Sequence, residues 1–500
     1  MRRSLAAFAL CLLTFDLPGC AKAQPAFSFS RPQDASPLAQ LQQDITAATT
    51  GPGVQRAAWG ILVESLNGGD RLFELNPGNL LVPGSGMKIV AVASAAEAVG
   101  WDYTFETTLL ATGPVTGGVL HGDLVITGNG DPSVLGRAGN DSLTPWTAAL
   151  RARGIGRIDG RIIGDDNAVE EPRPGFAWSW EDLAYAYGAL AGALNLGENA
   201  LALVVRAGTA ENAAATIESP SEAGDVSIVN HATTGPAGST ALLWPEWLPG
   251  DTRLTIEGSI PLGSPPVRLG VASGNPTRWF ARFVRARLIA DGIEVSGDAL
   301  DVDDLGHPPD EAHADVLYVH RSRPLGDIVE PLLKDSINLY AEAVLRLATG
   351  RNGRRATGAA LDATRARLES WGIPKDGIQM VDGSGLSRRN VVAPETLLAI
   401  LLRAYDPSGS SPFMRGLPVA GRDGTLASRM KGTAAEGNVV AKTGTLSNAR
   451  TLAGYVKTAD GEPLAFVIMV NNFEGTGADV IGTIDRMAAR LATFSRRAHR

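Results

Sequence analysis

Strand-like segments lie near both ends of this 500-residue chain. Short apolar runs cover residues 59–64 and 71–75 near the N-terminus, and residues 438–442, 451–456 and 464–470 near the C-terminus. The turn sequence Asn67-Gly68-Gly69-Asp70 joins the first two runs, and a pattern typical of an amphipathic helix follows the last run over residues 478–496. Because a buried strand must pair its backbone with neighbours, these runs predict one sheet assembled from both ends of the chain. The middle of the chain is then an insertion.

The insertion has its own sequence character, from about residue 105 to residue 312. Its short β-like runs are broken by Gly, Pro and Asp, and one amphipathic segment covers residues 279–289. Five hundred residues also exceed what one hydrophobic core serves, at roughly 100–200 residues per domain. We therefore expect a mixed α/β (α+β) fold. Residues 40–104 and 313–500 form an antiparallel sheet flanked by helices, and a large, mainly-β insertion over residues 105–312 interrupts them.

The first residues are typical of an export signal. Arg2-Arg3 supplies a positive start, residues 5–15 form a short apolar segment, and Ala21-Lys22-Ala23 offers a cleavage site between small residues. Residues 1–23 are therefore predicted to be a signal peptide. Residues 24–39, which are rich in Pro, Ser and Gln, are predicted to be a solvated linker. These features predict an exported, periplasmic protein.

A second interpretation of the export signal stays open. Leu17-Pro18-Gly19-Cys20 resembles the lipobox of bacterial lipoproteins, in which the cysteine is acylated. The protein is then either released or held at a membrane by a lipid on Cys20. The other cysteine of the chain, Cys11, also lies in the predicted signal peptide. Disulfides and thiolate metal sites are therefore excluded from the mature chain.

Charge and motif content exclude several classes of function. The net charge of −8, with no stripe of Lys and Arg, argues against nucleic acid as a partner. The six histidines are scattered without the H-E-x-x-H spacing of a zinc site, so we expect no metal. The sequence also lacks the G-x-S-x-G motif of α/β-hydrolases.

Ser85 and Lys88 form an S-x-x-K pattern just before the apolar residues 89–96. Positions i and i+3 share one face of a helix, so the lysine amine can reach the serine hydroxyl. The pair predicts a serine nucleophile with a lysine as its base. A second match, Ser428 and Lys431, precedes a segment with two glycines and no apolar periodicity, and we interpret it as a chance match.

Two further motifs strengthen this interpretation. Ser336-Ile337-Asn338 lies between helical patterns at residues 325–333 and 339–345, and Lys442-Thr443-Gly444-Thr445 ends a strand-like run. The patterns S-x-x-K, S-x-N and K-T-G are the set found in penicillin-binding proteins and class A β-lactamases. We therefore predict one catalytic site from five residues of these motifs: Ser85, Lys88, Ser336, Asn338 and Lys442.

More specifically, the chain resembles the class C low-molecular-mass penicillin-binding proteins of the D-alanyl-D-alanine carboxypeptidase/endopeptidase type. Gly130-Asp131-Pro132 is similar to the family's Gly-Asp-Pro turn, and residues 382–388 match its Asp-Gly-Ser-Gly-Leu-Ser-Arg signature. Residues 417–426 resemble the family's segment before Lys-Thr-Gly, and about 250 residues separate Ser85 from Ser336, a long insert of the kind that this family has. The resemblance implies a serine β-lactamase/transpeptidase-like domain.

The resemblance, with the residue types, implies a catalytic role for each motif. Ser85 attacks the carbonyl carbon of a D-Ala-D-Ala bond and forms an acyl-enzyme, while Lys88 takes the serine proton. Ser336 relays that proton to the leaving amine, and Asn338 holds the substrate amide and Lys88. Lys442 supplies positive charge near Ser336.

The same resemblance implies how a substrate is held. Thr443-Gly444-Thr445 binds the free carboxylate of the peptide. Arg388 and Asp166, or the adjacent Asp165, clamp the zwitterionic end of meso-diaminopimelate. The partners are then peptidoglycan peptides, with β-lactam antibiotics as covalent inhibitors, and no cofactor is required. A carboxypeptidase and an endopeptidase use the same chemistry and differ in the group that leaves.

Glycines on both sides of Ser85 depart from the family pattern, in which alanine is more usual at position 84. Because Gly lowers helix stability by about 1 kcal/mol relative to Ala, Gly84 and Gly86 predict a flexible helix start. This feature keeps open a non-catalytic, wall-binding scaffold with the same fold. A β-lactamase, which would share Ser85, Lys88 and Lys442, is the other alternative, although no dedicated deacylating glutamate can be identified.

Overall fold

The computed structural model describes residues 36–137, 143–171, 173–219, 227–247, 253–351 and 355–497. The predicted signal peptide, residues 1–23, and residues 24–35 of the predicted linker lie outside these ranges. Residues 37–39, which we expected in the linker, instead begin helix α1 (Pro37–Thr49). The physical reason is a helix cap, because the Ser36 hydroxyl accepts a hydrogen bond from the Ala39 backbone N–H at 3.2 Å.

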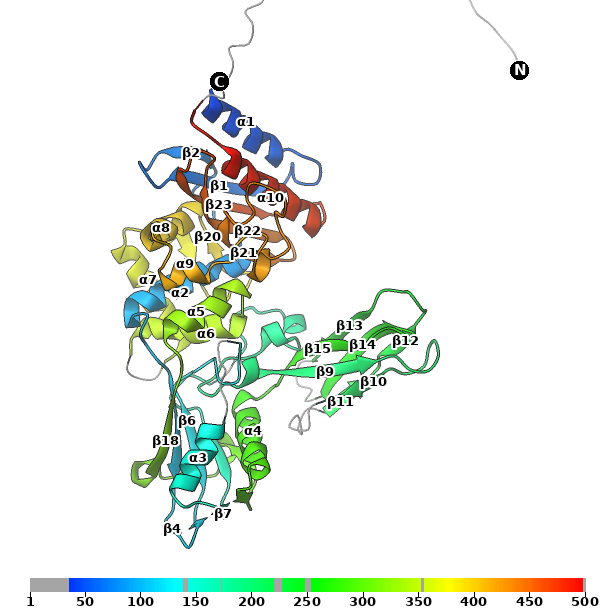
Figure 1. Cartoon of the computed structure of the whole chain (residues 1–500), viewed down its shortest axis with the longest axis vertical. Coiled ribbons are helices and arrows are strands. Elements are labelled where there is room, and N and C mark those ends of the chain that lie inside the picture. Colours follow the sequence, from blue (N-terminus) through cyan, green and yellow to red (C-terminus); the bar gives the residue numbers. More distant parts are fainter. Residues whose placement is uncertain are drawn as a thin grey trace, which may run out of the picture.

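Both ends of the chain build one antiparallel sheet of five strands, in the order β2-β1-β23-β22-β21 (Figure 1). The strands are β1 (Ala58–Ser65), β2 (Arg71–Leu75), β21 (Val440–Leu446), β22 (Ala449–Lys457) and β23 (Pro463–Asn471). Along β1, Ile61 and Val63 pack into one hydrophobic core, whereas Leu62 packs into another. The sheet is therefore buried on both faces. The prediction of a sheet shared by the two chain ends is confirmed.

Helices cover the two faces of this sheet. Helices α1 and α10 (Gly477–Thr493) share one core with it, and α2 (Met87–Val99) and α8 (Pro394–Ala404) share the other. Around α2 pack α5 (Leu325–Lys334), α6 (Asn338–Arg346) and α7 (Thr357–Ser370), while α9 (Pro412–Gly416) lies on α5. Most of α2 is buried, so Lys88, at 0% exposure, lies in the apolar interior. None of the helices in the described ranges has the length and apolar character needed to cross a membrane.

The insertion forms a separate layered unit below the five-stranded sheet in Figure 1. Its largest sheet has the order β17-β8-β6-β3-β18, and α3 (Thr144–Ala152) and α4 (Pro276–Ala290) pack into the same core. The strands are β3 (Glu106–Ala111), β6 (Leu124–Gly128), β8 (Ile162–Asp165), β17 (Ala299–Asp301) and β18 (Asp315–Arg321). Strand β18 pairs with β3, so the sheet of the insertion continues past residue 312, the predicted boundary.

Two further groups of strands complete the insertion. A short sheet has the order β16-β7-β5-β4, from β4 (Val115–Thr116), β5 (Val119–Leu120), β7 (Arg157–Ile158) and β16 (Glu294–Val295). We call the five-stranded sheet β2-β1-β23-β22-β21 and its helices the body. An arm of the insertion projects sideways from it (Figure 1). It contains β9 (Ala200–Arg206), β10 (Thr216–Glu218), β11 (Ser227–Asn230), β12 (Thr233–Gly235), β13 (Leu242–Glu246), β14 (Arg253–Pro261) and β15 (Val267–Ala272). The mainly-β character of the insertion agrees with the sequence.

Candidate active site

Ser85 lies in a short 3-10 turn, η1 (Gly84–Gly86), which leads directly into α2. One helical turn later, the Lys88 amine donates hydrogen bonds to Ser85 Oγ at 2.8 Å, to Asn338 Oδ1 at 2.6 Å and to the Ser384 carbonyl oxygen at 2.7 Å. Burial lowers the pKa of Lys88 from 10.5 to about 7, although the negative charges of Asp382 and Glu342 act in the opposite direction. A substantial fraction of this amine is therefore neutral near pH 7 and able to accept a proton.

Gly84, beside the nucleophile, has a packing role, while the expectation of a flexible helix start stays a prediction. Gly84 has φ +52°, and a Cβ atom there would lie 2.8 Å from the backbone N of Thr445 in β21. On the strand side, a Cβ atom at Gly444 would lie 2.0 Å from the Pro83 carbonyl oxygen. The absence of side chains lets η1 and β21 meet backbone to backbone. This contact fixes Ser85 beside Thr445.

The second and third motifs meet through Lys442. Ser336 lies between α5 and α6 with φ +62°, and its Oγ accepts a hydrogen bond from Lys442 Nζ at 2.9 Å. Lys442 is 0% exposed and also donates to the Thr443 carbonyl oxygen at 2.8 Å. Burial holds the pKa of Lys442 well below its usual value, and the positive charge of Lys88 acts in the same direction. The two lysines therefore approach the site from two different elements, α2 and β21.

These residues border a cleft of about 730 Å³. Its lining includes five of the predicted site residues, Ser85, Ser336, Asn338, Arg388 and Thr445. Lys88 and Lys442 lie behind the lining, where each touches a lining serine. Gly444 is buried against η1, and Thr443, at 7% exposure, donates its hydroxyl to Thr425 Oγ1 at 2.7 Å. Thr445 is the exposed hydroxyl of this strand end.

The structure does not bring Asp166 to the cleft. Asp166 is 2% exposed within the insertion and accepts a hydrogen bond from Thr277 Oγ1 at 2.5 Å, and burial raises its pKa to about 6. Asp165 accepts instead from the Asn167 backbone N–H at 2.8 Å. The acidic residues of the insertion that do line the cleft are Glu181 and Asp182. No local pattern in the sequence marks these two carboxylates as lining residues, because the tertiary fold brings them to the cleft.

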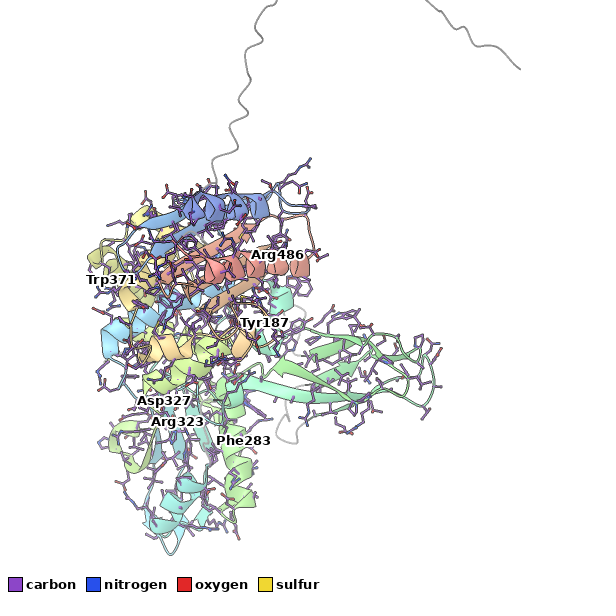
Figure 2. All side chains as sticks on the ribbon, turned by 45° about the horizontal axis from the view of Figure 1, so that its top comes forward. Tyr187, Phe283, Arg323, Asp327, Trp371 and Arg486 are labelled. Atoms are coloured by element: carbon purple, nitrogen blue, oxygen red, sulfur yellow. The ribbon has the colours of Figure 1, made fainter. Side chains whose placement is uncertain are left out.

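Glu181 and Asp182 lie in a segment of the insertion, between β8 and β9, that contacts the body. This segment contains η2 (Trp180–Asp182) and η3 (Ala186–Gly188), and Tyr187 lies where the body meets the arm (Figure 2). Asn338 Nδ2 donates to the Tyr187 carbonyl oxygen at 2.9 Å, and the Tyr187 hydroxyl donates to Asp182 Oδ1 at 2.8 Å. A chain of contacts therefore joins the second motif to the acidic wall of the cleft.

Asp382 is a structural centre that sequence reasoning did not single out. At 1% exposure, it accepts hydrogen bonds from the backbone N–H groups of Gly385 and Ser387 at 2.7 and 2.8 Å. Asn390 Nδ2 and Trp178 Nε1 donate to the same carboxylate at 2.8 and 2.9 Å. The carboxylate thereby fixes the loop that presents the Ser384 carbonyl group to Lys88 and Arg388 to the cleft.

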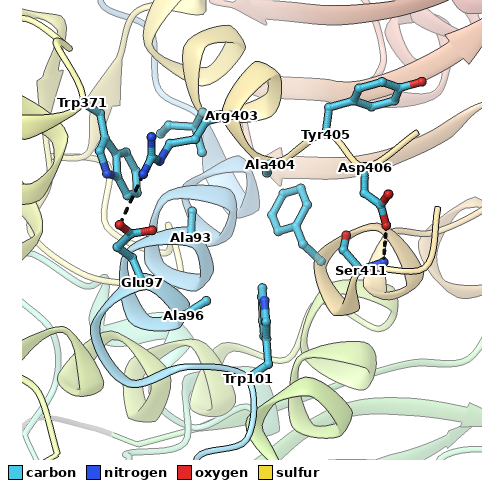
Figure 3. Close-up of a pocket in the computed structure, with 12 residues that line it drawn as sticks. Ala93, Ala96, Glu97, Trp101, Trp371, Arg403, Ala404, Tyr405, Asp406 and Ser411 are labelled. Atoms are coloured by element: carbon cyan, nitrogen blue, oxygen red, sulfur yellow. Dashed lines mark hydrogen bonds and ion pairs between the residues drawn. The ribbon is translucent and has the colours of Figure 1, made fainter. Parts of the chain in front are cut away.

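A second cavity, of about 510 Å³, lies beside the C-terminal half of α2 (Figure 3). There the Arg403 guanidinium lies 4.8 Å from the centre of the Trp371 ring and pairs with Glu97 at 3.2 Å. No predicted site residue lines this cavity. The nucleophile, its base and the second lysine all belong to the other cleft, which is therefore the candidate active site.

The family model of D-Ala-D-Ala carboxypeptidase 3 (S13) matches residues 41–493, most of the chain. The chain belongs to the D-Ala-D-Ala carboxypeptidase 3 (S13) family. A D-alanyl-D-alanine carboxypeptidase of Actinomadura sp. (strain R39) is 32% identical over 506 residues, which cover 99% of this chain and 91% of the relative. The family prediction is confirmed, and with it the class of enzyme, a D-Ala-D-Ala carboxypeptidase and thus a hydrolase.

Relatives in Haemophilus influenzae support the same S13 assignment in sequence and in fold. The D-alanyl-D-alanine carboxypeptidase DacB is 26% identical over 419 residues, which cover 83% of this chain and 85% of the relative. The crystal structure of penicillin binding protein 4 (dacB) superposes with a TM-score of 0.77 at 25% identity, and the match covers 90% of this chain and 99% of that chain. The predicted fold class is therefore confirmed over nearly the whole length of this S13 enzyme.

Proposed function

We propose that this S13 enzyme cleaves the D-Ala-D-Ala bond of peptidoglycan stem peptides through an acyl-enzyme on Ser85. The observation that carries the proposal is a buried Lys88 amine, with a pKa of about 7, at 2.8 Å from a serine hydroxyl that borders an open cleft. A serine hydroxyl is a weak nucleophile at neutral pH, and a neutral amine at hydrogen-bonding distance can take its proton.

The first half of the reaction is acyl transfer. Ser85 Oγ bonds to the carbonyl carbon of the penultimate D-Ala while its proton passes to Lys88 Nζ. The backbone N–H groups of Ser85 and Thr445 stabilise the oxyanion, each worth roughly 3 kcal/mol where such donors have been measured. The peptide C–N bond then breaks, and the leaving amine takes a proton through the Ser336 hydroxyl. In the second half, water attacks the ester, the shortened peptide leaves as an acid, and Ser85 Oγ regains its proton.

Polar groups on two sides of the cleft fit the two ends of the substrate. The exposed Thr445 hydroxyl can donate to the free carboxylate of the terminal D-Ala, since hydrogen bonds to an ionised acceptor are strong. Arg388 and Asp182, which both line the cleft, suit the carboxylate and ammonium groups of a meso-diaminopimelate side chain. We therefore replace Asp166 by Asp182 as the acidic half of the predicted clamp. The same binding mode serves a carboxypeptidase and an endopeptidase that splits D-Ala cross-links.

The site of action follows from the substrate. Peptidoglycan lies outside the cytoplasmic membrane, so we propose export by the signal peptide at residues 1–23 and action in the periplasm, with lipid attachment at Cys20 as the alternative to release. The name of the H. influenzae relative, penicillin binding protein 4, supports β-lactams as covalent inhibitors of Ser85.

The test is digestion of purified muropeptide monomers and cross-linked dimers, with wild type and Ser85→Ala compared. Wild type is expected to release terminal D-Ala or split the dimers, and the variant to do neither. Intact substrates in the presence of folded, penicillin-labelled wild type would refute the proposal. Labelled penicillin also separates the alternatives: a β-lactamase would release the label within seconds, and a scaffold protein would take up none.

A further inference from the structure

A buried carboxylate lies behind the Lys88 amine and takes no part in the mechanism above. Glu342 lies on α6, one helical turn after Asn338, and is 6% exposed. Its Oε1 accepts hydrogen bonds from the backbone N–H groups of Gly383 and Ser384 at 3.1 and 2.8 Å. The carbonyl oxygen of the same Ser384 accepts from Lys88 Nζ at 2.7 Å. One residue, Ser384, therefore connects the Glu342 carboxylate to the lysine base.

Helix α6 thus holds Lys88 in two ways. Asn338 contacts the amine directly at 2.6 Å, and Glu342 fixes the backbone that supplies another of its acceptors. Because both residues are on one face of one helix, a shift of α6 moves both contacts together. A proton acceptor must lie within a few tenths of an ångström of its ideal position. The contacts from α6 hold the Lys88 amine in place to that precision.

The charged groups that face Glu342 come from several elements. Lys88 lies on α2, and Asp382 lies in the loop of residues 382–388, which we call the signature loop. Arg346, at 7% exposure, lies one turn further along α6. Burial raises the pKa of Glu342 to about 7, and the Asp382 charge acts in the same direction, whereas the hydrogen bonds from Ser384 and the charge of Arg346 oppose it. Glu170 of the insertion acts on Arg346 in turn.

Glu342 also borders a cavity of its own. A space of about 270 Å³ is lined by Glu342, Arg346 and Asp382 from the body and by Glu170 and Arg173, among others, from the insertion. This space is large enough to hold water molecules, each of which needs about 30 Å³, and the charged side chains in its lining offer them partners. Glu342 therefore borders a space other than the substrate cleft.

We propose that Glu342 is a positioning residue for Lys88, which holds Ser384 against the amine and whose charge sets the pH range over which Ser85 is acylated. The inference rests on the proposed function, since it concerns the base of that reaction. An ionised Glu342 favours the ammonium form of Lys88, and only the free amine can accept the serine proton. Removal of the carboxylate charge therefore frees the amine at lower pH.

The test is the acylation rate by a fluorescent penicillin, measured from pH 5 to pH 9 in the full-length protein. Glu342→Gln keeps an oxygen that can accept from Gly383 and Ser384 but removes the charge, so the acidic limb of its profile is expected to move down by roughly one pH unit. Glu342→Asp keeps the charge but draws the carboxylate back, so its limb is expected to stay in place while the rate falls roughly tenfold to 100-fold. Glu97→Gln is the matched control, because it removes an exposed charge from the same helix as Lys88.

The outcomes separate this inference from the function on which it rests. A wild type that penicillin does not acylate overturns the proposed function and the inference together. A wild type that is acylated, with an acidic limb that Glu342→Gln leaves in place or that Glu97→Gln moves equally, overturns the inference alone. Thermal unfolding tests whether each variant is folded. If Glu342→Gln does not fold, Glu342→Asp is the deciding variant. Because Glu342→Asp retains the charge, a movement of the acidic limb of its pH profile would overturn the inference.

Discussion

Gly385 packs closely against the backbone of Gly84. Its φ is +81°, and a Cβ atom there would lie 1.8 Å from the Gly84 carbonyl oxygen, beside the nucleophile. Gly372 has the same φ, +81°, but no atom within 4 Å of the position of its Cβ. We predict that Gly385→Ala abolishes acylation by labelled penicillin, because the loop must move away from Ser85. Gly372→Ala should lower the free energy of unfolding by about 1 kcal/mol and leave acylation unchanged. Equal effects of the two substitutions on acylation would contradict this explanation.

The buried Lys88 amine makes the stability of the fold depend on pH. Its pKa is about 7 in the folded protein and 10.5 ordinarily, so between these values the unfolded chain binds a proton that the folded chain releases. The contribution of Lys88 to the free energy of unfolding therefore rises with pH across this window. In Lys88→Met, the gain between pH 7 and pH 10 should be smaller than in wild type, by on the order of 1–3 kcal/mol.

Urea unfolding at the two pH values measures the effect of Lys88. The exposed Lys457 supplies a control, since Lys457→Met removes an amine that is not buried and should leave the wild-type difference unchanged. An identical pH dependence in wild type and Lys88→Met would mean that burial does not lower the pKa of this amine. Acylation should be lost in Lys88→Met whatever its stability, because no base remains.

At the scale of elements, local sequence patterns predicted helices, whose backbone hydrogen bonds join residues close together in the sequence. The helical pattern over residues 279–289 lies within α4, and the patterns on either side of Ser336 became α5 and α6. The Ser36-Pro37 cap of α1 was also readable, but the Pro and Ser content of the preceding residues favoured a linker. By contrast, no pattern in a single sequence shows that the segment around Asp182 crosses to the cleft. That position depends on how the insertion packs on α6, which is a property of the tertiary fold.

The turn between α5 and α6 carries backbone strain at Ser336. A backbone φ of +62° is unfavourable for serine. The serine hydroxyl at this position nevertheless accepts the hydrogen bond from Lys442 Nζ. We predict that Ser336→Gly and Ser336→Ala lose substrate turnover to the same extent, because both lack the hydroxyl. The glycine variant should be more stable than the alanine variant by roughly 1 kcal/mol, since glycine adopts this φ freely. Thermal unfolding and D-Ala release measure the two effects, and equal stability of the variants would argue against strain at this turn.

At the scale of the whole molecule, residues of both the body and the insertion line the cleft. Trp178 Nε1 of the insertion donates to Asp382 Oδ2 of the body at 2.9 Å, across 204 residues of sequence. Asn338 of the body donates to the Tyr187 carbonyl oxygen of the insertion, across 151 residues. The sequence predicted a catalytic centre of three motifs because the resemblance covers short, recognisable segments. It did not reveal that Asp166 is buried away from the cleft, because contacts over such separations leave no local pattern.

Because the insertion lines part of the cleft, we predict that it affects the turnover of peptide substrates more than acylation by penicillin. Trp178→Phe removes one donor from the buried Asp382 carboxylate and should destabilise the fold by roughly 1–2 kcal/mol. It should also loosen the segment that carries Glu181 and Asp182, so kcat/KM for a diaminopimelate-containing peptide should fall further than the rate of acylation by penicillin, which lacks that side chain. Trp244→Phe is the control, since its indole donates to Glu246 within the arm at 3.1 Å. If both reactions slow equally in Trp178→Phe, the indole supports the signature loop alone, and the insertion does not discriminate between these ligands.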